Sequence, residues 1–327
     1  MSIAFVFPGQ GSQFVGMGRD IYEVSAAARR IFHQADEALG FDLRRLCWEG
    51  PEDILRETIN AQPAILTVSI ACWEALKERL ATLGKTVQPR FFAGHSLGEI
   101  TALVAAGSLD FNEAVTLVRE RGRLMKVDGD ANPGGMAAVL GLDDLALEKV
   151  CHDVARHGIV RPANYNSPGQ TVISGEISAL TAAIELAAER GARKIVRLAI
   201  SIASHSPLMQ RAAEGFAQAV SRAGIRDAAV PIIANFSAAA ISSAEELRRE
   251  MVDQITGSVR WSQSIAAMTE AGVHTIVEVG PGDALTGISR RISRELLAIS
   301  INGAEAIGLF ATRLREIENR QSRPTQF

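Results

Sequence analysis

The sequence has few of the residues that mark disulfide-bonded, zinc-binding and membrane proteins. It contains three cysteines in 327 residues, Cys47, Cys72 and Cys151, and no C-x-x-C pair. A disulfide framework and a metal site are therefore not expected. No stretch approaches the roughly 18 apolar residues of a membrane helix. The first residues, MSIAFVFPGQG, lack the basic and apolar regions of a signal peptide. We expect a cytoplasmic protein with reduced thiols that does not contact a membrane.

The chain also lacks an excess of positive charge. Its 34 Lys and Arg residues face 37 Asp and Glu residues, for a net charge of −3. A global basic field for binding nucleic acid is thereby excluded. There is no Walker motif, and the loop with Gly9 and Gly11 fails the G-x-G-x-x-G pattern because position 14 is Phe. We predict neither a nucleic-acid partner nor a bound cofactor.

The order of apolar runs and helical patterns predicts an α/β fold. Residues 3–7 and 91–93 are typical of buried strands, and helical patterns follow each of them. Residues 130–201 show the order β-α-β-β-α-β, which is ferredoxin-like. We therefore predict a large unit made of residues 1–129 and 202–315, with the smaller unit inserted and residues 129–135 as a linker. Residues 316–327 are predicted to be a polar tail that frays.

A serine between two glycines carries the sharpest chemical signal. Gly94-His95-Ser96-Leu97-Gly98 follows an apolar strand and opens a helix, which is the context of a G-x-S-x-G nucleophile elbow. The glycines permit a tight turn that exposes the Ser96 hydroxyl, and the helix N-terminus brings free N–H groups and a positive dipole end beside it. The Leu97 N–H would then be an oxyanion donor. The alternative is a glycine-rich loop with an inert serine.

A serine nucleophile needs a base, and His205 is the first candidate among six histidines. It lies in the loop SIASHSP where the chain leaves the smaller unit, and sites tend to form at such junctions. No acidic residue between Ser96 and His205 has a distinctive context. A Ser–His dyad with a carbonyl oxygen in place of the carboxylate therefore stays open beside a triad. Gln10, in the loop after the first strand, could offer a second oxyanion N–H; the alternative is a plain turn.

Arg121 is the most informative charge, because it falls in the centre of an apolar helical stripe. The stripe is formed by Leu117, Val118, Leu124 and Met125. An arginine in such a place must find a buried anion or extend its head group to solvent. It is either half of a structural salt bridge or a bidentate clamp for a substrate carboxylate.

Eight motifs occur in order along nearly the whole chain: FVFPGQGSQ, AQPAILT, GHSLGE, ERG, NYNSPGQ, ASHSPLM, EVGPG and LTG. Together they resemble the malonyl-CoA:acyl carrier protein transacylase family, which includes the related acyltransferase domains of polyketide synthases. The resemblance implies an α/β-hydrolase-like large subdomain that carries an inserted ferredoxin-like small subdomain. It thus agrees with the order of strands and helices above.

The resemblance also implies a role for each matching residue. Ser96 corresponds to the acylated nucleophile and His205 to its base. The remaining positions bind or orient these groups: the Gln10 and Leu97 N–H groups form the oxyanion hole, Arg121 binds the free carboxylate of malonyl, Gln62 lines the pocket, and the backbone carbonyl of Gln254 holds the histidine.

The implied activity is ping-pong transfer of a malonyl group from malonyl-CoA, as substrate, to the phosphopantetheine thiol of holo acyl carrier protein, by a monomer without a prosthetic group. Residues 202–205 read IASH, which matches neither the HAFH of malonyl-selective nor the YASH of methylmalonyl-selective polyketide domains. A branched acyl donor and a trans-acting polyketide role therefore stay open. A serine thioesterase or hydrolase and a non-catalytic domain are the alternatives from other classes.

Overall fold

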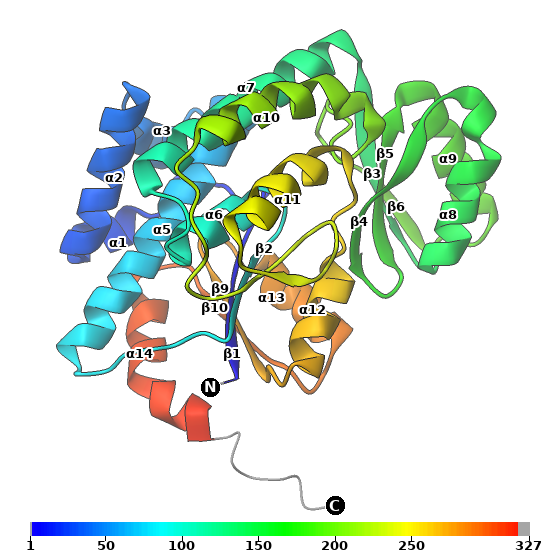
Figure 1. Cartoon of the computed structure of the whole chain (residues 1–327). Coiled ribbons are helices and arrows are strands. Elements are labelled where there is room, and N and C mark those ends of the chain that lie inside the picture. Colours follow the sequence, from blue (N-terminus) through cyan, green and yellow to red (C-terminus); the bar gives the residue numbers. More distant parts are fainter. Residues whose placement is uncertain (1, 320–327) are drawn as a thin grey trace, which may run out of the picture.

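The computed structural model describes residues 2–319, which form two sheets with helices around them (Figure 1). The six-stranded sheet has the order β10-β9-β1-β2-β7-β8, and the four-stranded sheet has the order β4-β5-β3-β6. The strands are β1 (Ile3–Phe7), β2 (Phe91–Gly94), β3 (Gly134–Leu140), β4 (Val160–Ser167), β5 (Gln170–Glu176), β6 (Lys194–Arg197), β7 (Ile232–Ile233), β8 (Ala240–Ile241), β9 (Thr275–Val279) and β10 (Leu297–Ile301).

The helices surround the two sheets, most of them the large one. They are α1 (Arg19–Val24), α2 (Ala26–Leu39), α3 (Leu43–Glu49), α4 (Glu52–Arg56), α5 (Thr58–Thr82), α6 (Leu97–Ala105), α7 (Phe111–Ala131), α8 (Asp144–Asp153), α9 (Ile177–Glu189), α10 (Gln210–Arg222), α11 (Ala244–Thr256), α12 (Trp261–Glu270), α13 (Ala284–Ile292) and α14 (Ala304–Asn319), with 3₁₀ turns at Ala155–His157 and Pro207–Met209. Within residues 2–319, none of the helices combines the length and apolar character that crossing a bilayer requires.

The large sheet is parallel from β10 to β7, and only β8 runs antiparallel to its neighbour. Its central strand β1 is buried on both faces. Ile3, Phe5 and Phe7 belong to one core, and Ala4 and Val6 to a second core with residues of α12 and α13. A strand covered by helices on both sides is an uninterrupted apolar run rather than an alternating one. This explains why the uninterrupted apolar run IAFVF predicts a buried strand.

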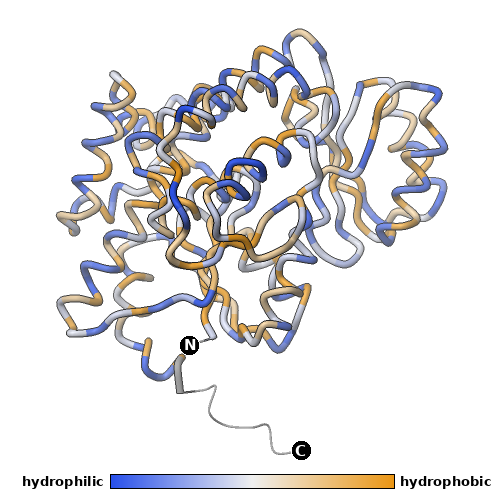
Figure 2. The backbone as a smooth tube through the Cα atoms, viewed as in Figure 1, coloured by the Kyte–Doolittle hydropathy of each residue, from blue (hydrophilic) through white to orange (hydrophobic). Residues whose placement is uncertain are grey.

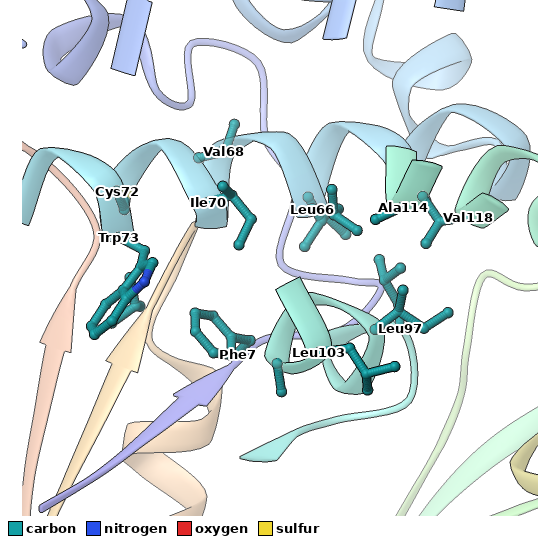
Figure 3. Close-up of a cluster of buried hydrophobic side chains, with 14 of the residues drawn as sticks. Phe7, Leu66, Val68, Ile70, Cys72, Trp73, Leu97, Leu103, Ala114 and Val118 are labelled. Atoms are coloured by element: carbon teal, nitrogen blue, oxygen red, sulfur yellow. The ribbon is translucent and has the colours of Figure 1, made fainter. Parts of the chain in front are cut away.

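Helix α5 forms the centre of the larger core. Figure 3 shows Leu66 of α5 above Phe7 and Trp73 of α5 to its left, with Leu97 of α6 and Val118 of α7 to its right. Figure 2 shows apolar residues along the central strands and mixed polar and apolar residues along the surrounding helices. The first residue of α6 is therefore anchored in the core at the point where β2 ends. Helix α5 begins at Thr58 and includes Pro63 in its second turn.

The smaller unit presents one face of its antiparallel sheet to the larger unit and packs α8 and α9 against the other (Figure 1). The side chains on the inner face include Met136, Val172 and Leu198. The backbone of β4 also continues onto the larger unit, because the Tyr165 N–H donates to the Val259 carbonyl at 2.9 Å and the Val259 N–H donates to the Ala163 carbonyl at 2.8 Å. The two units are thus joined by backbone hydrogen bonds beside the connecting segments.

Two of the predicted boundaries are wrong. The linker predicted at residues 129–135 shrinks to residues 132 and 133, because α7 runs to Ala131 and β3 begins at Gly134. Gly129 marks a close approach, since a Cβ there would lie 3.0 Å from Ile202. The polar tail predicted at residues 316–327 starts too early: α14 extends to Asn319 and Ile317 is buried. Residues 320–327 lie outside the described residues.

Glycine at position 94 is required by the packing of the elbow. A Cβ on Gly94 would lie 1.9 Å from the backbone carbonyl of Gly98, a contact that neither backbone can relieve. We expect Gly94→Ala to destabilise the protein by about 3 kcal/mol or more, because the strand and helix must separate. Urea unfolding measures this. The matched control is Gly308→Ala in α14, where a Cβ meets nothing within 4 Å, so that it should be neutral or stabilising. Equal effects of the two substitutions would contradict the prediction.

Candidate active site

Ser96 lies in the turn between β2 and α6, in a backbone conformation that few serines adopt. Its φ is 52° and its ψ is −107°, a strained region that persists only where the surroundings enforce it. The side chain of Asn235 supplies part of that constraint. Its Oδ1 accepts from the Ser96 N–H at 2.7 Å, and its Nδ2 donates to the Gly94 carbonyl at 2.7 Å. One amide therefore ties together both sides of the turn.

His205 faces the serine and is oriented by two backbone carbonyls. Its Nδ1 lies 2.7 Å from the Gln254 carbonyl oxygen and 3.2 Å from that of Gly257. Since both partners can only accept, Nδ1 carries the proton. The lone pair of Nε2 is then free to accept from the Ser96 hydroxyl, whose Oγ is 2.8 Å away. The arrangement is a Ser–His pair in which carbonyl oxygens take the place of the carboxylate of a triad.

The imidazole of His205 is held in its neutral form. Burial and the positive charge of Arg121 lower the pKa of His205 to about 3, while the hydrogen bonds to Gln254 and Gly257 act in the opposite direction. The side chain is only 3% exposed. It is therefore unprotonated and able to take a proton throughout the physiological range.

Arg121 reaches the same point from α7 and is buried without a salt bridge to any described residue. Its Nη1 donates to Gln62 Oε1 at 2.8 Å, and its Nη2 donates to Gln254 Oε1 at 3.0 Å and to Ser96 Oγ at 3.1 Å. Its Nε–H is buried and has no acceptor among residues 2–319. Burial lowers the pKa of Arg121 to about 10, so the guanidinium stays charged at neutral pH. A cation held by neutral groups beside a nucleophile is suited to an anionic substrate group.

Gln62, on α5, connects Arg121 to the first loop. Its Nε2 donates to Thr58 Oγ1 at 2.9 Å, and Thr58 in turn donates to Gln10 Oε1 at 2.9 Å. Gln10 lines the cavity beside Ser96, and Leu97 is the first residue of α6, so that the Leu97 N–H has no acceptor within its own helix. The structure thus brings together all seven predicted site residues. Their roles stay predictions.

The cavity at this point lies between the two units and measures about 190 Å³. The large unit contributes the residues described above, and the inner face of the small sheet contributes Met136 and Val172. The sequence prediction missed His95 and Asn166, which meet across the cavity with His95 Nε2 2.9 Å from Asn166 Oδ1. Burial lowers the pKa of His95, so this histidine is also neutral.

Asn235 was missed as well, although the sequence held a signal for it. It follows the apolar run at residues 230–234, and β7 pairs in parallel with β2. Because the carboxyl ends of neighbouring parallel strands lie at one edge of a sheet, a polar residue there falls near the end of β2. Among residues 2–319, no three His, Cys, Asp or Glu side chains come close enough together to hold a metal ion.

Comparison with known proteins identifies the family. A family model described as an acyl transferase domain matches residues 4–320. The malonyl CoA-acyl carrier protein transacylase of Bacillus subtilis (strain 168) is 44% identical over 315 residues, which cover 96% of this chain and 98% of that protein. The enzyme of that name from Escherichia coli (strain K12) is 39% identical over 304 residues, or 93% and 97% of the two chains. The chain belongs to the malonyl CoA-acyl carrier protein transacylase family.

Solved structures of this transacylase family share the mixed α/β fold. The acyl-carrier-protein-S-malonyltransferase of Bartonella henselae superposes with a TM-score of 0.92 at 41% identity, covering 97% of this chain and 100% of that one. A second structure shows a type II PKS acyl-carrier protein in complex with its malonyl-transacylase. It has a TM-score of 0.90 at 38% identity and covers 95% and 99% of the two chains.

The low pKa of His205 predicts how the reactivity of Ser96 depends on pH. We expect the rate at which a fluorophosphonate labels Ser96 to change less than about threefold between about pH 5 and pH 7. A histidine with an ordinary pKa near 6.5 would lose about 25-fold over the same interval through protonation. A time course of labelling, quenched at intervals and followed by mass spectrometry, measures the rate. Ser96→Ala, which lacks the nucleophile, is the control for labelling elsewhere. A rate that falls with an inflection between pH 6 and 7 would contradict the lowered pKa.

Proposed function

We propose that this chain transfers a malonyl group from malonyl-CoA to the phosphopantetheine thiol of acyl carrier protein through a malonyl-serine at Ser96. The observation that carries the proposal is the buried Arg121 guanidinium, which lies 3.1 Å from Ser96 Oγ and has neutral partners and a free N–H. A free carboxylate two bonds from the reacting carbonyl is the group that this cation suits. The complex of a relative with an acyl carrier protein supports the partner.

In the first half-reaction the carboxylate of malonyl-CoA binds Arg121. The Ser96 proton passes to His205 Nε2 as Oγ attacks the thioester carbonyl carbon. The N–H groups of Gln10 and Leu97 stabilise the resulting oxyanion, and one such donor typically contributes about 10²–10³ in rate. The C–S bond then breaks, and the CoA thiolate leaves with the proton from His205. The product is a malonyl ester of Ser96.

In the second half-reaction the carrier protein's thiol occupies the place that CoA has left. His205 takes the thiol proton, the sulfur attacks the malonyl ester, and Ser96 Oγ leaves and regains a proton from His205. Such general acid–base help contributes roughly 10²–10⁴ in rate. Nε2 takes and returns one proton in each half, so the enzyme ends unchanged. The kinetics are ping-pong because CoA leaves before the carrier protein's thiol reacts, with the malonyl group held on Ser96 in between.

The proposal extends to the finer architecture and to the setting. The strand order β4-β5-β3-β6 with two helices on one face supports a ferredoxin-like small subdomain. The parallel sheet with a serine elbow after β2 supports an α/β-hydrolase-like large subdomain. We further propose that the enzyme acts as a monomer in the cytoplasm and needs no prosthetic group, with malonyl-CoA as substrate only.

Intact-protein mass spectrometry tests the transfer directly. Mixing with malonyl-CoA should add one malonyl group, which peptide mapping should locate on Ser96, and adding holo acyl carrier protein should move it to the carrier. Ser96→Ala should acquire no adduct. An adduct that is lost only to water would make the chain a hydrolase. An adduct from a branched acyl-CoA but not from malonyl-CoA would overturn the choice of donor.

Substitution of Arg121 tests the carboxylate clamp. We expect Arg121→Ala to lower kcat/KM for malonyl-CoA by about 100-fold or more, because a charge-assisted bidentate contact is lost. Transfer of an uncharged acetyl group should fall by less than about tenfold. The matched control is Arg123→Ala on the same helix, where Arg123 pairs with Glu120 at the surface and both rates should stay unchanged. Equal losses for the two donors in Arg121→Ala would show that the residue is structural.

A further inference from the structure

A buried carboxylate that the proposed mechanism does not use lies one turn beyond the nucleophile. Glu99, on α6, is 1% exposed. Its Oε1 accepts from the Asn235 N–H at 2.8 Å, and its Oε2 accepts from the side-chain Nε2 of Gln254. Both oxygens are therefore occupied by N–H donors, and neither donor belongs to a cation. A carboxylate is costly to bury in this way, and its contacts have two consequences for the site.

The first consequence concerns the side-chain amide of Gln254. Its Nε2 faces two acceptors, Glu99 Oε2 and, at 3.3 Å, the Ser96 carbonyl oxygen. Its Oε1 faces the other way and accepts from Arg121 Nη2 at 3.0 Å. Turning the amide by half a rotation would set oxygen against two acceptors and nitrogen against a guanidinium donor. Glu99 thus selects the amide orientation in which Gln254 can hold Arg121.

The second consequence is electrostatic. When ionised, Glu99 places a negative charge near Arg121 with an amide between them, and that charge acts to raise the pKa of Arg121. A direct carboxylate–guanidinium pair would occupy the N–H groups that an anionic substrate needs. With Gln254 interposed, Arg121 keeps an Nε–H that has no acceptor among residues 2–319. Burial and the charge of nearby Glu250 raise the pKa of Glu99 well above its usual range, against the hydrogen bonds from Asn235 and Gln254 and the charge of Arg121.

We propose that Glu99 is a positioning residue that fixes the Gln254 amide and thereby holds the Arg121 guanidinium beside Ser96, so that it sets the preference for acyl groups bearing a carboxylate. The proposal rests on the proposed function. It assigns Glu99 an effect on donor choice and not on the chemistry of the serine, because His205 is held by the backbone of Gln254 and not by its side chain.

The test is Glu99→Gln, assayed with malonyl-CoA and with acetyl-CoA as donors. The new amide has one oxygen, whereas both the Asn235 N–H and Gln254 Nε2 need an acceptor. One of these two hydrogen bonds is therefore replaced by two N–H groups that face each other. We expect kcat/KM for malonyl transfer to fall by about 10- to 100-fold, the usual effect of losing a hydrogen bond to a charged group. Acetyl transfer, which does not use Arg121, should change less than about threefold.

Glu278→Gln is the matched control. Glu278, on β9, is a second fully buried carboxylate, and its two oxygens accept from the Leu285 N–H at 3.1 Å and the Thr286 N–H at 2.7 Å. Among residues 2–319 it makes no hydrogen bond to Gln254 or Arg121, so its substitution should leave the ratio of malonyl to acetyl transfer unchanged. The same shift in that ratio for Glu278→Gln would mean that any buried carboxylate has this effect and would overturn the proposal.

The outcomes separate the inference from the proposed function. A wild-type protein that forms no malonyl-serine would end the proposed function. If the wild-type protein transfers malonyl, and Glu99→Gln lowers kcat/KM equally for both donors or for neither, only the inference is contradicted. If thermal unfolding shows that Glu99→Gln does not fold, Gln254→Leu replaces it, because it removes the amide and leaves Glu99 bound to Asn235. An unchanged donor ratio in Gln254→Leu would likewise overturn the proposal.

Discussion

A guanidinium buried without a direct carboxylate partner is the constraint on which the site depends. Removing such a cation from water costs several kcal/mol, and neutral amide oxygens return only part of that. The cost is tolerated because α5 and α7 pack in the largest core of the molecule and bring Gln62 to the guanidinium. Under the proposed function, this incomplete compensation makes the site selective, because a substrate carboxylate supplies the missing negative charge and an uncharged acyl group does not.

The same cation couples substrate binding to the base. Arg121 is one of the causes that lower the pKa of His205, after burial. Under the proposed function, a substrate carboxylate bound to Arg121 opposes that cause and makes His205 a stronger base. Arg121 Nη2 also lies 3.1 Å from Ser96 Oγ, so the cation that acts on the pKa of the base is next to the serine as well. The base itself is held by carbonyl oxygens in place of the carboxylate of a triad.

Features of the site that depend on neighbouring residues could be predicted from the sequence, whereas contacts between residues far apart in the chain could not. The elbow at residues 94–98 and the place of Arg121 in an apolar stripe are local patterns, so periodicity and glycine spacing were enough to find them. Asn235 and Glu99 were missed because their contacts join residues 136 to 155 positions apart. The side-chain amide of Gln254 was missed for the same reason. Family resemblance pointed to its backbone carbonyl only. The polar character of residues 315–316 likewise concealed that α14 continues to bury Ile317.

The inserted unit does more than close the cavity, because its attachment lies next to the base. The backbone of β4 pairs with Val259, and two residues earlier the Gly257 carbonyl accepts from His205. Asn166, the next residue of β4 after Tyr165, meets His95 beside the nucleophile. A displacement of the small sheet therefore moves an acceptor of His205 and a neighbour of Ser96 together. The position of the smaller unit therefore helps to set the geometry of the Ser–His pair. This explains why the site lies between the units rather than within either.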